Sequence, residues 1–143
     1  MIDIKELRFG NYVSLTDPSG ETGNVVVGGI MPDKILLRLP DKVTSVGEEK
    51  LNGIIISDWQ HEDGFEINPI PLTEDLILKC GFKRDMRLKQ VFRLGLIDLM
   101  HFGTWSLFDD REDMDFLDLP LEYLHQLQNL YFALTGKEIE VEL

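Results

Sequence analysis

The segment LEYLHQLQNLYFALTG, residues 121–136, is the most regular stretch of the sequence, and it predicts a helix from Leu121 to Thr135. At about 100° per residue, six apolar or aromatic side chains fall within an arc of about 120°, as expected for a helix that packs on a core. They are Tyr123, Leu124, Leu127, Leu130, Tyr131 and Leu134. Gly136 follows at the position where glycine ends many helices in a left-handed conformation.

The opposite side of this helix is polar but uncharged. No charged residue occurs from Tyr123 to Gly136, although 28% of the chain is charged. Helix positions that face solvent usually carry Lys or Glu, so this side is expected to be partly covered. Cover by the rest of the chain is the favoured interpretation, and cover by a partner is the alternative. The candidate interaction face consists of Leu121, His125, Gln128 and Phe132.

Length and composition indicate a globular protein of the cell interior. The 143 residues, 43% of them hydrophobic, suffice for one domain or for two small halves that share a core. Cys80 is the single cysteine, which excludes an internal disulfide and favours a reducing compartment. The opening residues carry Asp3 and Glu6 where a signal peptide is basic and then apolar, and no apolar run approaches the roughly 18 residues of a membrane span. We therefore expect a cytoplasmic protein without membrane contact.

The net charge of −12 bears on partners. It repels phosphate backbones, so direct nucleic-acid binding is disfavoured. Protein partners, self-association or small molecules are the expected alternatives.

The expected fold class is α+β, with a β-rich half at residues 1–68 and an α+β half at residues 69–143 that share one core. In the first half, short apolar segments separated by turn residues predict an antiparallel meander or half of an SH3-like barrel. The expected strands are Tyr12–Thr16, Asn24–Met31, Ile35–Leu39 and Gly53–Ser57. The start Gly10-Asn11-Tyr12-Val13, with Gly28-Gly29 in the next strand, resembles the opening of such barrels.

Asn68-Pro69-Ile70-Pro71 marks the boundary, because prolines cannot donate ladder hydrogen bonds and keep the preceding residues extended. The second half is predicted to form an antiparallel sheet packed by two helices, at about 74–80 and 121–135. Thr73 is the expected N-cap of the first helix, which Gly81 ends. The expected strands are Phe82–Leu88, Val91–Leu96, Thr104–Phe108 and the alternating end Glu138–Leu143, which could pair with a second copy as an exposed edge.

The sequence offers no pattern that demands catalysis, a cofactor or a metal. His61, His101 and His125 lie too far apart for the short ligand spacings of zinc sites, and no phosphate-binding glycine loop or nucleophile elbow occurs. Cys80 falls on the apolar stripe at a helix end, where a thiol behaves as a small hydrophobe. An enzyme that uses His61 or His101 with a carboxylate stays open as a minor alternative.

Two runs of opposite charge lie in the second half. The acidic run from Asp109 to Asp118 lacks the glycine and final glutamate of a calcium loop and is expected to be solvated. The basic run from Lys79 to Arg93 has six cations and one acidic residue, Asp85. The two runs can attract each other, within one chain or between copies.

The stretch YLHQLQNLYFALTGKE, residues 123–138, resembles the C-terminal signature of small uncharacterised proteins of gut bacteria and their phages or mobile elements. Leu7–Val13 and the segment from Pro69 to Phe82 are also similar to that group. The resemblance implies a bacterial cytoplasmic protein of mobile-element origin, and it implies no catalytic residue.

The function expected from these observations is a non-enzymatic interaction module. An acidic mimic of nucleic acid, which would occupy a DNA-binding protein, is the alternative from another class. Its signature would be carboxylates spaced over one surface like phosphates.

Overall fold

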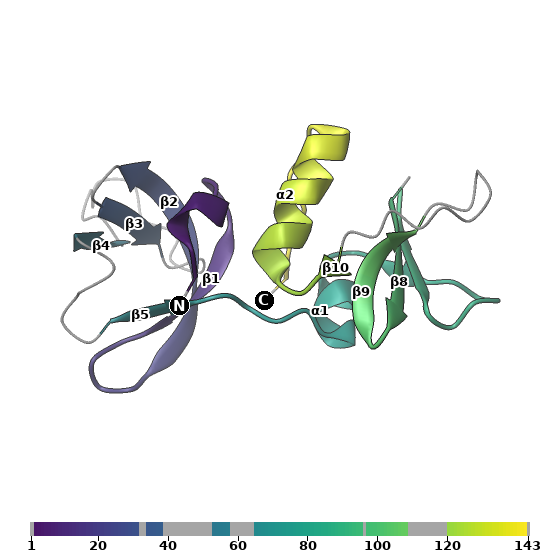
Figure 1. Ribbon diagram of the computed structural model, residues 1–143, viewed down its shortest axis with the longest axis horizontal. Coiled ribbons are helices and arrows are strands. Elements are labelled where there is room, and N and C mark those ends of the chain that lie inside the picture. The colour runs from purple at the N-terminus through teal and green to yellow at the C-terminus, as the bar shows by residue number, and fades with distance from the viewer. Residues whose placement is uncertain are drawn as a thin grey trace. The chain divides into compact units, whose positions relative to one another are not determined.

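The computed structural model describes residues 2–31, 34–38, 53–57, 65–95, 97–108 and 120–142 (Figure 1). Contacts divide the chain into two compact units, Met1–Ile70 and Pro71–Leu143. The boundary falls inside the segment Asn68-Pro69-Ile70-Pro71. That the two halves share one core stays a prediction.

The first unit contains a five-stranded antiparallel sheet that follows a short 3-10 helix, Ile4–Glu6. Its strands are β1 (Tyr12–Thr16), β2 (Thr22–Met31), β3 (Lys34–Arg38), β4 (Gly53–Ser57) and β5 (Glu66–Asn68). The strand order is β4-β3-β2-β1-β5, so four consecutive strands form a meander and β5 pairs with β1. The antiparallel meander predicted for this half is confirmed.

Strand β2 is long because its two ends pair with different partners. Thr22–Val26 pairs with β1, and Val26–Met31 pairs with β3, with a bulge between Val27 and Gly29. A side chain at Gly28 would place its Cβ 2.8 Å from Nε of Arg38, so glycine lets the arginine lie against the bulge. Alternate residues of these strands form the buried core with Ile2 and Leu7, namely Val13, Leu15, Val25, Val27, Ile35, Leu37 and Ile67.

The buried side chain of Asn11 organises the turn before β1. Its Oδ1 accepts a hydrogen bond from the backbone N–H of Arg8 at 2.7 Å, and its backbone carbonyl accepts one from Val27 at 2.8 Å. Gly10 completes this turn with a φ of 90°, where glycine is favoured. A buried amide is stable here because its polar atoms have partners.

The second unit combines two helices with a second antiparallel sheet, of order β10-β9-β8-β7-β6. Its elements are α1 (Glu74–Lys79), β6 (Lys83–Arg84), β7 (Val91–Leu94), β8 (Ile97–Phe102), β9 (Thr104–Phe108), β10 (Pro120–Leu121) and α2 (Leu124–Thr135). Phe92 and Trp105 meet edge to face inside this sheet, with ring centroids 5.2 Å apart. The two antiparallel sheets and the two helices confirm the predicted α+β class and both predicted helices.

Both helices begin at identifiable caps. The hydroxyl of Thr73 accepts a hydrogen bond from the N–H of Leu76 at 3.2 Å, as expected of an N-cap. In α2, the side-chain carbonyl of Gln126 accepts from the N–H groups of Glu122 and Tyr123 at 2.9 and 3.1 Å. This helix begins three residues later than expected because Pro120–Leu121 pairs with β9.

Three strand predictions in the second half were wrong in their bounds or existence. The strand expected at Phe82–Leu88 ends at Arg84, where a turn begins at Asp85. The strand expected at Val91–Leu96 ends at Leu94, and a hairpin at Gly95, with a φ of 59°, leads into β8, which was not predicted.

The third error concerns the end of the chain. Residues 138–142 form no strand. Ile139 is buried, and the N–H of Glu142 donates to the carbonyl of Lys79 at 3.2 Å. This segment therefore makes its contact with the end of α1.

Candidate functional site

The four residues of the predicted interaction face differ in their exposure. Leu121 in β10 and His125 and Gln128 in α2 are buried, whereas the side chain of Phe132 is 39% exposed. The ring of His125 also stacks on Tyr123, with centroids 5.9 Å apart. In this structure only Phe132 of the four is open to a partner, and the interaction face as a whole stays a prediction.

Helix α2 changes character along its length. Its first half buries Leu124 and Leu127 as predicted, but Leu134, which belongs to the same predicted stripe, is 53% exposed. Phe132 and Ala133 are also exposed, and no charged side chain lies on this end of the helix. The last turn is ordered all the same, because the Thr135 hydroxyl donates to the Tyr131 carbonyl at 2.7 Å. We call residues Tyr131–Thr135 the exposed end of α2.

A pocket of about 410 Å³ lies beside this exposed end, within the second unit. Tyr131, Leu78, Leu94 and Ile139 give it an apolar lining, while Lys79, Lys137 and three glutamates of the C-terminal segment contribute charges. Apolar walls with a few polar groups are typical of binding pockets. The pocket therefore joins the exposed end of α2 to the end of α1.

Cys80 also borders this pocket, but as an inert group. Its thiol is buried, and burial raises its pKa to about 12. At neutral pH the side chain is therefore a thiol and not the thiolate that a nucleophile or metal ligand requires. The expectation that Cys80 sits in an apolar environment is confirmed.

The two histidines among the described residues each stack on an aromatic ring. His61 lies outside the described residues, as does the acidic run 109–118. His101 in β8 stacks on Trp105 of β9, with ring centroids 4.2 Å apart and planes 9° from parallel. Within the described ranges no cluster of three or more His, Cys, Asp or Glu side chains could hold a metal ion.

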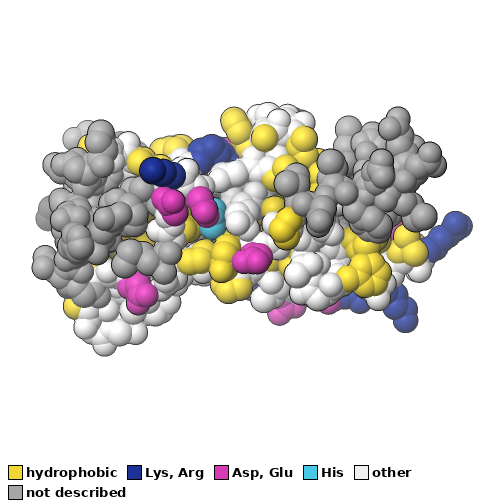
Figure 2. Space-filling view, viewed as in Figure 1, with side chains coloured by type: hydrophobic (Ala, Val, Ile, Leu, Met, Phe, Trp, Pro, Cys, Tyr) yellow, Lys and Arg dark blue, Asp and Glu magenta, His cyan; other side chains and the backbone are white. Residues whose placement is uncertain are grey.

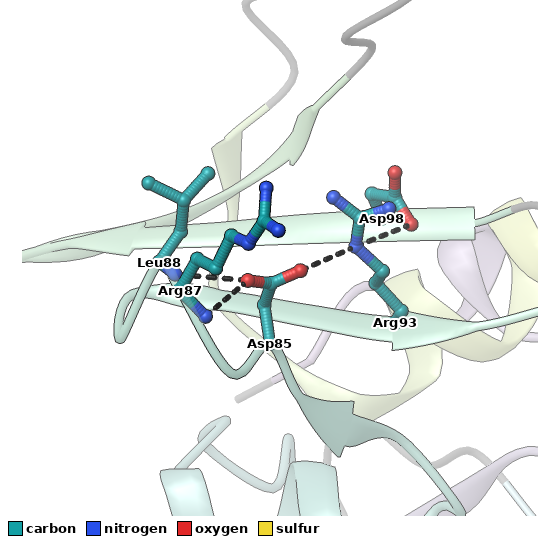
Figure 3. Close-up of polar contacts among 5 residues, drawn as sticks. All are labelled: Asp85, Arg87, Leu88, Arg93 and Asp98. Carbon is teal, nitrogen blue, oxygen red and sulfur yellow. Dashed lines mark hydrogen bonds and ion pairs between the residues drawn. The ribbon is translucent and has the colours of Figure 1, made fainter.

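A second distinctive region is the hairpin that joins β6 to β7 (Figure 3). The carboxylate of Asp85 accepts hydrogen bonds from the N–H groups of Arg87 and Leu88 at 2.7 and 2.8 Å. These bonds lower the pKa of Asp85, since they favour its charged form. The Nε atom of Arg93 lies 3.2 Å from Oδ2 of Asp85 and 3.8 Å from Oδ1 of Asp98.

The sequence interpretation missed this turn by extending a strand through it. Asp85 is followed two and three residues later by the backbone groups that it binds, a pattern in which Asp commonly begins turns. An aspartate inside an otherwise basic run was the signal that could have identified the turn.

Comparison with protein-family models, with curated proteins and with solved structures found no match. In the described part of the chain, no helix is long and apolar enough to cross a membrane. The candidate functional regions of the described residues are the exposed end of α2 with its pocket and the β6–β7 hairpin.

Proposed function

We propose that this protein is a non-enzymatic protein-interaction module. The observation that supports this proposal is the exposed end of α2, which presents Phe132 and Leu134 on an ordered and uncharged helix end. Single exposed apolar residues are common, but aromatic and aliphatic side chains grouped on a rigid element are typical of protein contacts. Solvated helix ends more often carry Lys or Arg, which interact favourably with the helix dipole.

The neighbouring pocket supports the same proposal. A partner side chain that enters the space between Leu78, Leu94 and Tyr131 would remove further apolar surface from water. A well-packed anchor residue in such a pocket commonly supplies much of the binding energy of an interface. The exposed end of α2 would then form the rim of the interface around that pocket.

The proposed setting is the cytoplasm of a bacterium, with an origin in a phage or another mobile element. Its support is the resemblance of residues 123–138 to proteins of that origin, together with a single buried cysteine. Neither a cofactor nor a metal is part of this proposal.

The test compares two charge insertions of similar exposure in the same unit. Leu134→Glu places a carboxylate on the exposed end of α2, and Phe102→Glu places one at the β8–β9 turn, where the side chain is 65% exposed. Proteins captured by the wild type from bacterial lysate are identified, purified and titrated calorimetrically against all three forms.

The expected result is a binary complex that Leu134→Glu weakens at least tenfold, by about 1.4 kcal/mol, and that Phe102→Glu leaves unchanged. Light scattering of the protein alone shows whether the partner is a second copy. An equal effect of both variants, or a protein that forms no binary complex, contradicts the proposal.

A further inference from the structure

The β6–β7 hairpin concentrates positive charge in an acidic chain. Residues 83–93 contain five cationic side chains and one carboxylate, so the rest of the sequence carries a formal net charge of −16. Lys83 lies directly opposite Arg93 in the β6–β7 register, although like charges in that position repel each other. The local potential therefore has the opposite sign to that of the whole chain.

Only some of these cations are paired inside the unit. Arg84 forms an ion pair with Glu74 and lies over the ring of Phe92, with 5.3 Å from Cζ to the centroid. Arg93 interacts with Asp85 and Asp98. The remaining cations, Lys83, Arg87 and Lys89, are exposed and form no ion pair with the described residues.

The hairpin also exposes apolar side chains at its tip. Met86 is fully exposed and Leu88 is 50% exposed. Cationic side chains stand out beside apolar ones at the right of Figure 2, the place that this loop occupies in Figure 1. Full exposure of Met86 leaves its apolar surface in water.

This tip has a fixed shape. Besides the two bonds to the Asp85 carboxylate, the N–H of Asp85 donates to the carbonyl of Val91 at 2.8 Å, and that of Val91 donates to Leu88 at 3.0 Å. A concavity of about 590 Å³ is lined by Asp85, Met86, Arg87, Leu88 and Arg93. A preorganised surface loses less conformational entropy on binding than a disordered loop would.

We propose that the β6–β7 hairpin is a second docking surface, which binds an acidic protein segment through an apolar anchor residue. The anchor occupies the concavity against Met86 and Leu88, and flanking carboxylates of the partner approach Lys83, Arg87 and Lys89. The charges steer the encounter and the apolar contact supplies affinity. This inference goes beyond the exposed end of α2 and does not depend on it.

The concavity and the charges favour a protein segment over the two other anionic partners. A single side chain can enter the concavity beside Met86 and Leu88, whereas a membrane surface cannot. Nucleic acid would bring many phosphates close to a chain that is strongly acidic outside the hairpin, and salt-dependent phosphate contacts need an extended basic surface.

The probe is a synthetic glutamate-rich peptide with one central phenylalanine, titrated into the isotope-labelled full-length chain. Two matched peptides replace that phenylalanine by serine or all glutamates by glutamine. Amide shifts of residues 83–93 are expected to move with the first peptide, and the affinity is expected to fall at least fivefold with either replacement and to decrease with added salt.

The hairpin variants are Met86→Ser and Arg87→Glu, and the control is Lys5→Glu in the other unit, where Lys5 is also exposed. We expect a severalfold loss of affinity for Met86→Ser, about a tenfold loss for Arg87→Glu and no loss for the control. All three positions are solvent-exposed, so folding is retained and is checked by amide spectra.

The inference is overturned by peptide binding that neither hairpin variant changes, or by equal binding of the glutamine peptide. Tighter binding of a single-stranded oligonucleotide, or of vesicles containing phosphatidylserine, overturns it as well. A concentration-dependent dimer abolished by Arg87→Glu, in a protein that does not bind the peptide, would also overturn it and assign the surface to self-association. Leu134→Glu is expected to leave peptide binding intact. Failure of the hairpin proposal and failure of the α2 proposal are therefore separate outcomes.

Discussion

The carboxylate of Asp85 lies 3.2 Å from Nε of Arg93 while it also accepts two backbone hydrogen bonds from its own turn. One side chain thus fixes the shape of the hairpin and neutralises part of the charge beside it. The Asp85 side chain is only 19% exposed and its hydrogen bonds lie within one turn, so its main effect is on the local order of that turn.

The first prediction concerns that order. Asp85→Ala removes the acceptor for the N–H groups of Arg87 and Leu88, so these amides should exchange with solvent at least several times faster than in the wild type. Hydrogen exchange followed by NMR measures this effect. Asp75→Ala in the first turn of α1 is the control and should leave both amides unchanged. Equal rates in wild type and Asp85→Ala would show that other contacts hold the turn.

The second prediction follows from the lowered pKa of Asp85. The ordinary value is 3.8, and bonds from the Leu88 and Arg87 N–H groups favour the charged carboxylate in the folded chain. The order that Asp85 confers is therefore fully present above its unfolded pKa and is lost as pH falls through the lower, folded pKa. An NMR titration of the Leu88 amide should give a midpoint below that of Asp85 in the urea-unfolded chain. A midpoint equal to or above the unfolded one would contradict the hydrogen-bonded geometry.

The third prediction concerns Cys80. With a pKa of about 12, only about one thiol in ten thousand is ionised at pH 8, against roughly one in ten at the ordinary value of 9.0. Labelling by a thiol reagent at pH 8 should therefore be about 1,000-fold slower in the native protein than in urea, where the same cysteine is exposed. Labelling at similar rates in both conditions would contradict the burial of the thiol.

The fourth prediction concerns Asn11. Asn11→Ala leaves the part-buried N–H of Arg8 without the acceptor that the buried Asn11 side chain provides, which should lower the stability of the first unit by about 1–3 kcal/mol. Exchange of the paired amides in β1 and β2 should accelerate by about 5- to 150-fold. Asn24→Ala, at an exposed position of β2, is the matched control and should change exchange by less than twofold.

The sequence predicted the fold class and the helices because these depend on local signals. Thr73 and Gly136 act as caps in the structure as their residue types indicate. Gly95 was difficult to interpret as a turn residue, because apolar residues continue on both sides of it and mask the hairpin between β7 and β8. Periodicity alone cannot distinguish one long strand from two short ones that meet at such a turn.

The candidate surfaces were less predictable, because exposure is a property of tertiary structure. The uncharged side of α2 suggested cover, and His125 and Gln128 are indeed buried, but the same pattern does not reveal where along the helix burial stops. The Met86 tip was assigned to a strand, where alternate residues would have been buried. The exposed end of α2 and the Met86 tip can be identified only when the ends of the neighbouring helices and strands are known.

The fifth prediction tests where burial stops in α2. Leu127 is fully buried and Leu134 is 53% exposed, although both belong to one helical stripe. Leu127→Ala should therefore lower the free energy of unfolding by about 2–5 kcal/mol, because it leaves a cavity, whereas Leu134→Ala should cost less than about 1 kcal/mol. Both side chains have the same size and lie in the same helix, so helix propensity and lost volume cancel in the comparison.

Urea unfolding of both variants, followed by tryptophan fluorescence in a Trp59→Phe background, reports on the second unit through Trp105 alone. Similar losses for the two variants would mean that Leu134 is covered in solution, and therefore that the exposed end of α2 is part of the core or of a stable dimer. A small loss for Leu134→Ala, with a large one for Leu127→Ala, leaves an apolar helix end in water that folding does not require. That outcome leaves Phe132 and Leu134 accessible to the partner proposed above.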